Sequence, residues 1–259
     1  MNILIIGDIV GRTGRNVLKE HLNEIKDEYN VDITIANGEN AAGGNGITRK
    51  VADELFNIGI SALTMGNHVW DQKEIFKFIE DEKRIIRPAN YLEGTPGRGS
   101  VILTIKNIKL GIINLQGNIY MPCNRNPFIV ALEEVDKLSE ETNLIIVDFH
   151  AEATSEKIAM GHFLDGRVTC VFGTHTHVQT ADEKILNKGT AYISDVGMTG
   201  PSDSVLGIDK NLIIKKFISS VPVRFEIAEG PGQINGVVID VDESTSKSKS
   251  IIRINKIYT

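Results

Sequence analysis

The segment MNILIIGDIVGRTGR, residues 1–15, contains a continuous apolar run at residues 3–6 that is followed at once by Gly7 and Asp8. Four apolar residues are too few for a signal-peptide core or a membrane span, and no basic segment precedes them. A short run of aliphatic, mostly β-branched residues bounded by glycine predicts a buried strand. The segment therefore predicts an α/β protein with a carboxylate at the carboxyl end of its first strand.

Further apolar runs alternate with helical patterns along the chain. Strands are predicted at residues 3–6, 33–36, 62–65, 101–105, 110–115, 144–149, 170–172, 191–194, 236–240 and 251–254. Helices are predicted at residues 14–29, 48–58, 71–81, 127–141 and 155–164, with none after about residue 205 and a polar turn at residues 244–250. This alternation predicts βαβ units around a largely buried sheet, in a single domain of residues 1–259.

The composition is that of an ordinary globular domain, because 41% of the 259 residues are apolar and 24% are charged. A net charge of −6 argues against binding to duplex nucleic acid but allows a small anionic substrate if the site supplies its own cations. Cys123 and Cys170 are far apart and predict no disulfide framework, so we expect a reducing cytoplasm and no membrane association. A homo-oligomer is left open.

Polar side chains with ligand chemistry follow five of the predicted strands, directly at their carboxyl ends. The loops at the carboxyl ends of parallel strands form the functional crevice of open α/β sheets, so we expect these groups to meet at one edge. The groups are Asp8, Glu39, Asn40, Asn67, His68, His150, His175 and His177.

The mixture of imidazole, carboxylate and amide groups indicates a transition-metal site. Histidine with carboxylate suits Mn, Fe, Zn or Co, whereas Ca²⁺ prefers oxygen ligands alone. Without His68, the set still has too many candidate ligands for one ion. Two ions about 3.5–4 Å apart that share a carboxylate would use them all.

Several of these residues also have an ordinary structural explanation. Asp8 could cap the helix that follows it, and Asn67 with His68 could form a simple turn. Asp148 alternates with His150 along one predicted strand, where it either orients a ligand from behind or is merely a satisfied polar residue.

Other polar residues have weaker claims. Arg12 and Arg15 open the first predicted helix, where they either contact phosphate or form salt bridges. Residues 43–46 are expected to shape the rim of the site. His21 and His162 lie in polar helical segments and are expected to have no catalytic role.

The order of these motifs resembles that of the calcineurin-like metallophosphoesterases. The segments GDIVGRTGR, ITIANGENAAGGNGIT, MGNHVWD and DGRVTCVFGTHTHVQTAD are similar to those of the YmdB-type family of bacterial cyclic-nucleotide phosphodiesterases. The resemblance covers nearly the whole chain. It implies a four-layer αββα sandwich and a dinuclear iron or manganese site.

The chain departs from the broad superfamily at two positions. Val10 stands where a histidine ligand is usual, and Gly38-Glu39-Asn40 replaces a Gly-Asp motif. Similarity to the YmdB-type family implies that Glu39 bridges two ions and that Asn40 replaces the missing histidine. It implies one ion on Asp8, Glu39, Asn40 and His177, and a second on Glu39, Asn67, His150 and His175. His68 matches the proton donor.

The implied activity is hydrolysis of 2',3'- or 3',5'-cyclic nucleotides. A metal-bridging hydroxide would attack phosphorus while His68 protonates the leaving alkoxide as general acid. The same site would also serve a phosphomonoesterase or a nuclease. A different class of function is a regulatory, RNA-interacting protein in which the site senses a metal or ligand. A complete ligand set beside His68 favours catalysis.

Overall fold

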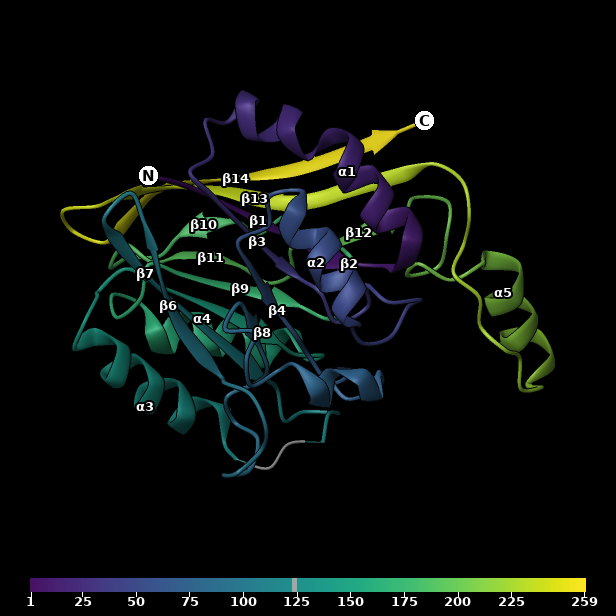
Figure 1. The fold of residues 1–259 in the computed structure, drawn as a ribbon, viewed down its shortest axis with the longest axis horizontal. Coiled ribbons are helices and arrows are strands. Elements are labelled where there is room, and N and C mark those ends of the chain that lie inside the picture. The colour runs from purple at the N-terminus through teal and green to yellow at the C-terminus, as the bar shows by residue number, and fades with distance from the viewer. Residues whose placement is uncertain (123–124) are drawn as a thin grey trace.

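Two β-sheets stacked face to face form the centre of the molecule, in a computed structural model that describes residues 1–122 and 125–259 (Figure 1). The first sheet has the order β2-β12-β13-β1-β3-β4-β5, with β14 paired to β13. Its strands are β1 Asn2–Ile6, β2 Asp8–Ile9, β3 Ile33–Asn37, β4 Ala62–Thr64, β5 Ile85–Ile86, β12 Met198–Pro201, β13 Gly232–Asp242 and β14 Lys247–Tyr258.

The second sheet has the order β10-β11-β9-β8-β7-β6. Its strands are β6 Ser100–Ile105, β7 Ile108–Gln116, β8 Ile145–His150, β9 Cys170–Thr174, β10 Lys184–Ile185 and β11 Ala191–Ile193. In the first sheet β1, β3 and β4 run parallel, and in the second β7, β8, β9 and β11 do. The carboxyl ends within each set therefore lie at one edge.

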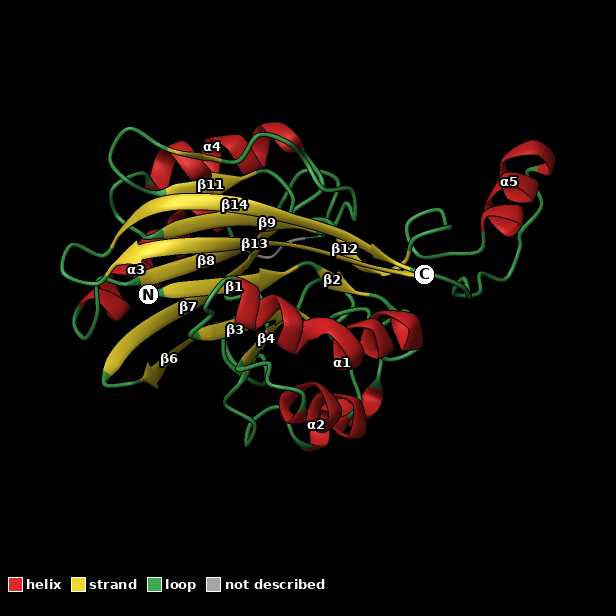
Figure 2. Ribbon diagram, turned by 90° about the horizontal axis from the view of Figure 1, so that it is seen from above, coloured by secondary structure: helices red, strands yellow, loops and turns green. Residues whose placement is uncertain are grey.

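Helices cover the outer face of each sheet and complete a four-layer αββα sandwich, as the sequence predicts (Figure 2). The helices are α1 Gly11–Glu28, α2 Arg49–Asn57, α3 Pro127–Ser139, α4 Thr154–Leu164 and α5 Lys210–Ser219. Side chains of α1 and α2 pack on the first sheet, and side chains of α3 and α4 pack on the second.

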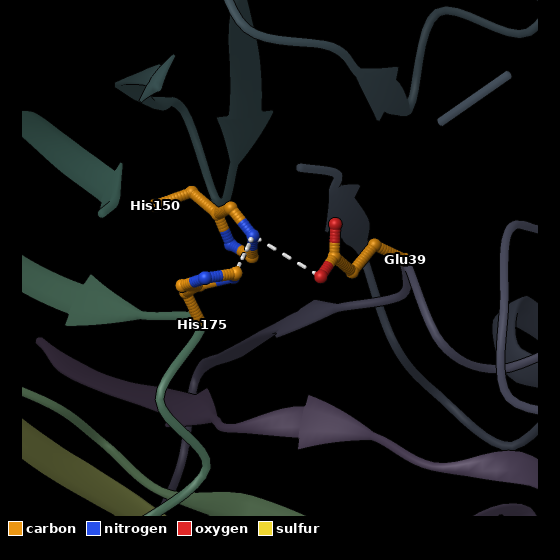
Figure 3. Close-up of side chains that lie close together, drawn as sticks. All are labelled: Glu39, His150 and His175. Atoms are coloured by element: carbon orange, nitrogen blue, oxygen red, sulfur yellow. Dashed lines mark hydrogen bonds and ion pairs between the residues drawn. The ribbon is translucent and has the colours of Figure 1, made fainter. Parts of the chain in front are cut away.

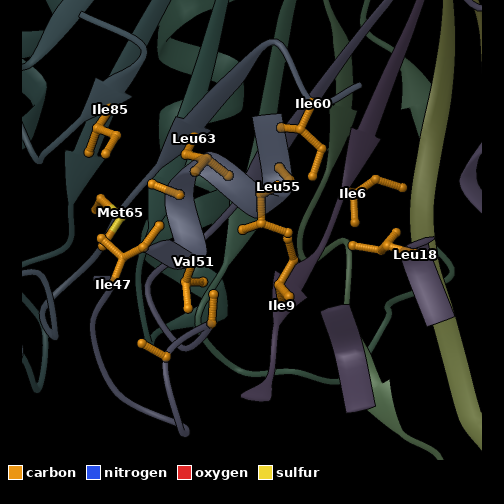
Figure 4. Close-up of a cluster of buried hydrophobic side chains, with 14 of the residues drawn as sticks. Ile6, Ile9, Leu18, Ile47, Val51, Leu55, Ile60, Leu63, Met65 and Ile85 are labelled. Carbon is orange, nitrogen blue, oxygen red and sulfur yellow. The ribbon is translucent and has the colours of Figure 1, made fainter. Parts of the chain in front are cut away.

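Strand periodicity explains the layers. Leu4 and Ile6 of β1 belong to the cluster under α1 and α2, in which Leu18 and Leu55 also lie (Figure 4). Ile5, one residue away from each, instead belongs to the cluster between the two sheets. Because successive side chains point to opposite faces, a strand buried on both faces is apolar throughout.

Three predicted elements were wrong. Residues 71–81 form only a short 3-10 helix, Lys73–Lys77. The preceding Gln72 supplies no side-chain cap to it, and its amide donates to the carbonyl of Asn45. The predicted polar turn at 244–250 is too long, since β14 already begins at Lys247. The chain forms a further helix after residue 205, α5, whose first turn is capped by the Asp209 carboxylate.

The helix α5 stands away from the sandwich in both views (Figures 1 and 2). The assignment of residues 1–259 to one domain stays a prediction. Cys123 lies outside the described residues. Within those residues, the helices lack the length and apolar character that crossing a membrane requires.

Candidate metal centre

The strand ends of both sheets meet at one place and bring the predicted ligands together. In the first sheet, Asp8 follows β1, Glu39 and Asn40 follow β3, and Asn67 follows β4. In the second sheet, His150 is the last residue of β8, and His175 and His177 follow β9. The site thus lies across the two sheets rather than within one.

The first group of ligand atoms surrounds Nε2 of His150 (Figure 3). Glu39 Oε1, Asn67 Oδ1 and His175 Nδ1 each lie 3.1 Å from that nitrogen. A ring nitrogen can make only one good hydrogen bond at a time. Such a convergence of lone pairs is instead the arrangement that a metal ion requires, and Glu39, His150 and His175 could hold one.

The second group contains Asp8, Asn40 and His177. Nε2 of His177 lies 3.1 Å from the side-chain amide of Asn40 and 3.9 Å from Oδ1 of Asp8. The same Asn40 amide donates to Glu39 Oε1 at 3.2 Å. Glu39 therefore belongs to both groups and joins them.

The Asp8 carboxylate favours a ligand role over a helix cap. The residue before α1 is Val10, and no side chain caps that helix. Asp8 Oδ2 accepts from the backbone N–H of His175, while Oδ1 is buried with no hydrogen-bond partner in the described structure. A buried carboxylate oxygen without a partner is costly unless a cation binds it, so the donor set fits metal ions.

Each of the three imidazoles directs one nitrogen to the cluster and uses the other to hold an outer partner. His150 Nδ1 lies 2.9 Å from Thr174 Oγ1, and His175 Nε2 lies 3.0 Å from a carboxylate oxygen of Glu152. His177 Nδ1 lies 3.1 Å from the carbonyl oxygen of Leu206. Outer partners of this kind fix the tautomer of metal-binding histidines.

Asp148 lies behind His150 and is linked to it through the Thr174 hydroxyl. The Thr174 hydroxyl that accepts from His150 donates to Asp148 Oδ1 at 2.7 Å, and Thr64 and Asn37 donate to Asp148 Oδ2. Burial raises the pKa of Asp148 to about 6, against the opposing effect of His150 and these donors. Asp148 therefore orients His150 through Thr174, which decides between the two roles left open for it.

The loop that carries His175 and His177 is held by a buried ion pair. Both histidines have left-handed backbone angles, with φ of 94° and 65°, which are strained for residues other than glycine. Between them, Thr176 donates both its N–H and its hydroxyl to Asp195 Oδ2. Lys157 of α4 also binds Asp195 Oδ2, at 2.7 Å, and both charged side chains are buried.

Asp195, two residues beyond the end of β11, is not among the ligand residues that the sequence predicts. Lys157 had no sequence signal, because a lysine in an amphipathic helix is normally solvated. Glu152, two residues beyond β8, was likewise missed.

Protonation in the metal-free chain follows from this crowding. Burial opposes the charge on His150, but Glu39 and the neighbouring carboxylates outweigh it and raise the pKa of His150 to about 9. Burial also disfavours the charged form of Glu39, yet His150 and His68 hold its pKa below the usual range. Burial, together with the positive charge of His150, lowers the pKa of His175 to about 3. Burial raises the pKa of Asp8, against the opposing effect of His177.

His68 lies outside both groups and faces the same cavity. Its Nδ1 lies 2.8 Å from Asp71 Oδ2, and its backbone N–H donates to Glu39 Oε2. About a third of its side chain is exposed. Just before it, Gly66 permits the close approach of the ligands, since a β-carbon there would lie 2.2 Å from Glu39 Oε2 and 2.3 Å from His150 Nε2.

Two arginines considered for phosphate binding have other partners. Arg15 binds Glu54 at 3.0 Å and the carbonyl of Ala41 at 2.6 Å, so it has a structural role. Arg12 is exposed, lies 3.6 Å from Glu229, and borders a different hollow between α1 and the C-terminus. His21 stacks on Tyr258, away from the cluster.

A cavity of about 200 Å³ opens beside the cluster. Its polar side includes Glu39, Asn40, His68, His175 and His177, and Gly44 and Asn45 form part of its rim, as expected for residues 43–46. The remaining lining is apolar and consists of Val10, Leu206, Ile208 and Ile227.

The fold is of the metallophosphoesterase type. The structure matches a NAD nucleotidase of Haemophilus influenzae with a TM-score of 0.63 at 14% identity, covering 100% of this chain and 56% of that one, which shows the shared fold alone. The chain belongs to the family of YmdB-like proteins, whose model matches residues 4–254.

Closer relatives span nearly the whole chain. It is 52% identical over 254 residues to the 2',3'-cyclic-nucleotide 2'-phosphodiesterase of Bacillus subtilis, covering 98% of this chain and 96% of the relative. A crystal structure of a phosphatase from Mycoplasma pneumoniae superimposes with a TM-score of 0.93 at 38% identity, covering 100% of this chain and 94% of that one. The predicted family is confirmed.

Proposed function

We propose that the chain is a metal-dependent phosphodiesterase that hydrolyses 2',3'-cyclic nucleotides. The observation that carries this is the arrangement of His150, His175 and His177, each with one nitrogen in a cluster joined by Glu39 and the other held from outside. The named activity of the 52% identical relative supports the substrate class.

The two groups of ligand atoms would hold two ions, iron or manganese by ligand chemistry and family resemblance. Asp8, Asn40 and His177 would hold one, and Asn67, His150 and His175 the other, with Glu39 shared. When bound, two such cations lower the pKa of a water molecule and neutralise charge that develops on the phosphate. Contacts with Thr174, Glu152 and the Leu206 carbonyl position the three imidazoles.

His68 would supply the proton that the leaving alkoxide needs. It faces the cavity but is not required as a ligand, and Asp71 fixes its ring by binding Nδ1. Because Asp71 accepts the Nδ1 proton, the doubly protonated ring is the form whose Nε2 can donate a proton to the substrate. The hydrogen bond from its backbone to Glu39 keeps this donor beside the shared carboxylate.

Replacing His68 tests the assignment. General acid catalysis contributes about 10²–10⁴-fold, so His68→Ala should lose that much kcat on 2',3'-cyclic AMP, with both ions retained and a much smaller loss on a bis-nitrophenyl ester. His162→Ala, at an exposed helix position, is the matched control. Equal loss on both substrates, or loss of an ion, would overturn the role of His68.

A substrate panel tests the activity itself. The metal-loaded protein should hydrolyse 2',3'-cyclic nucleotides faster than 3',5'-cyclic nucleotides, linear dinucleotides or phosphomonoesters. Preference for a monoester or a dinucleotide would make the chain a phosphomonoesterase or nuclease. A loaded protein inactive on every ester would favour a regulatory or ligand-sensing role.

A further inference from the structure

The cavity beside the cluster has two chemically different sides. Part of its lining consists of candidate ligands and His68, and another part is aliphatic: Val10, Leu206, Ile208 and Ile227. None of these four side chains has a hydrogen-bonding group. A small ligand that reaches the ions therefore meets an apolar surface with the remainder of its structure.

Leu206, one of the four residues of this apolar surface (the apolar wall), has a strained backbone conformation. Its φ of 54° lies in the left-handed region, where glycine and asparagine are favoured and leucine is not. Its side chain is 48% exposed, so packing in the core does not explain the choice of leucine. Its carbonyl oxygen lies 3.1 Å from Nδ1 of His177. Leu206 is therefore in direct contact with a candidate metal ligand.

Ile227 completes the wall from the other end of the segment that carries α5. It forms an isolated bridge with Ile208, which ties the two ends of that segment together at the cavity. Gly44 makes room for it, since a β-carbon there would lie 2.8 Å from Ile227 Cδ1, and the φ of Gly44 is 103°. The glycine-rich loop therefore shapes the apolar side of the cavity rather than a phosphate cradle.

We infer that this wall, Val10, Leu206, Ile208 and Ile227, binds the nucleobase and sugar of the phosphodiester substrate. The inference rests on the proposed function, which places the phosphate at the cluster. A nucleobase has flat apolar faces that a wall of branched aliphatic side chains can cover. Because the wall offers no donor or acceptor to a base edge, it binds by contact area and does not distinguish the four bases.

The test compares a cyclic nucleotide with a cyclic ester that has no base. Glycerol 1,2-cyclic phosphate has the same five-membered phosphate ring as 2',3'-cyclic AMP but nothing to contact the wall. The loss of a few methyl or methylene groups from a binding pocket typically changes discrimination by tenfold or more. Leu206→Ala should therefore lower the ratio of kcat/KM for 2',3'-cyclic AMP to that for glycerol 1,2-cyclic phosphate about tenfold. Leu92→Ala, at a leucine that is 57% exposed and outside the cavity, should leave the ratio unchanged.

A second variant separates binding from structure. Leu206→Asn suits the left-handed backbone better, so it should keep or raise the melting temperature while it lowers the same ratio. A lower melting temperature with an unchanged ratio would mean that Leu206 is structural. The wild-type enzyme should hydrolyse the cyclic phosphates of adenosine, guanosine, cytidine and uridine within about tenfold of one another, against the roughly 10⁴–10⁵-fold rejection typical of hydrogen-bonded readout.

The outcomes also separate this inference from the proposed function. If the wild-type protein hydrolyses neither cyclic ester, the proposed function fails. If it hydrolyses both and neither Leu206 variant changes their ratio, or if one base is preferred by more than 100-fold, the proposed function stands and the apolar wall is not the base site.

Discussion

The two halves of the candidate metal cluster, one around His150 and one around His177, differ in how closely their ligand atoms approach one another. Around His150, the ligand atoms of Glu39, Asn67 and His175 are already at 3.1 Å, and His150 is fully buried. Around His177, the nearest oxygen of Asp8 is 3.9 Å away and has no hydrogen bond in the described structure. Ligands of both halves line the cavity. The ligand atoms lie closer together in the first half, which we call closed, than in the second, which we call open.

The difference has a chemical consequence. In the closed half, three ligand atoms lie within 3.1 Å of His150 Nε2, and Thr174 and Asp148 lie behind His150. In the open half, Asp8 Oδ1 has no hydrogen-bond partner in the described structure, and an ion would satisfy it. We therefore expect the closed half to bind its ion more tightly, and the open half to exchange its ion and meet the substrate.

Removal of Glu39 should have the largest effect, because that carboxylate belongs to both halves. Glu39→Ala should deplete both ions and reduce diesterase activity to background. Elemental analysis of the purified variant measures this, with Glu156→Gln, at another buried glutamate, as the control. One ion retained at full occupancy would show that Glu39 serves a single half.

The buried Lys157–Asp195 pair holds the loop that supplies one histidine to each half. Lys157→Met leaves the Asp195 charge buried without a cationic partner, which typically costs about 3–5 kcal/mol in the free energy of unfolding. Urea denaturation measures it. The double variant Lys157→Met/Asp195→Asn removes the uncompensated charge and should recover part of the loss. If Lys157→Met were as stable as the wild type, the buried ion pair between Lys157 and Asp195 would be contradicted.

Thr174→Val breaks the contact behind the closed half alone. Loss of an outer partner typically costs about 10–100-fold in metal affinity, so the tighter ion should weaken by that factor in a chelator competition. Thr34→Val is the matched control, since Thr34 is equally buried and its hydroxyl has no hydrogen-bond partner in the described structure. Equal weakening by both variants would mean that the effect is general destabilisation.

Protons compete with the ion in the closed half. The pKa of His150 is raised from 6.5 to about 9 in the metal-free fold, so its proton stabilises that fold below pH 6.5, and the gain is lost as the pH rises through 9. Ion binding must release this proton, so affinity should rise about tenfold per pH unit between pH 7 and 9. His175, with a pKa of about 3, is already neutral. Calorimetry in buffers of different ionisation enthalpy counts the protons, and release of none would contradict the protonated state of His150.

The polar groups that interrupt apolar strands predict an α/β protein with its ligand residues at strand ends, and the family resemblance implies the four layers. The expectation of one edge of a single sheet was wrong, because the strand ends of two stacked sheets supply the ligands. The sequence does not predict Lys157 or Thr174, whose roles depend on which side chains meet across different elements. It also misses α5, although Asp209 is a good cap, because residues 213–214 look equally like part of a strand. Leu206 has no signal, since only its φ distinguishes it.

The distance between two bound ions tests the central claim most directly. A crystal of the metal-loaded protein, measured at the absorption edge of its metal, should show two anomalous peaks about 3.5–4 Å apart. The carboxylate of Glu39 should contact both ions, through one oxygen or through both. His150 should bind one ion and His177 the other. A single peak, or two peaks of which Glu39 contacts only one, would contradict a dinuclear site bridged by that residue.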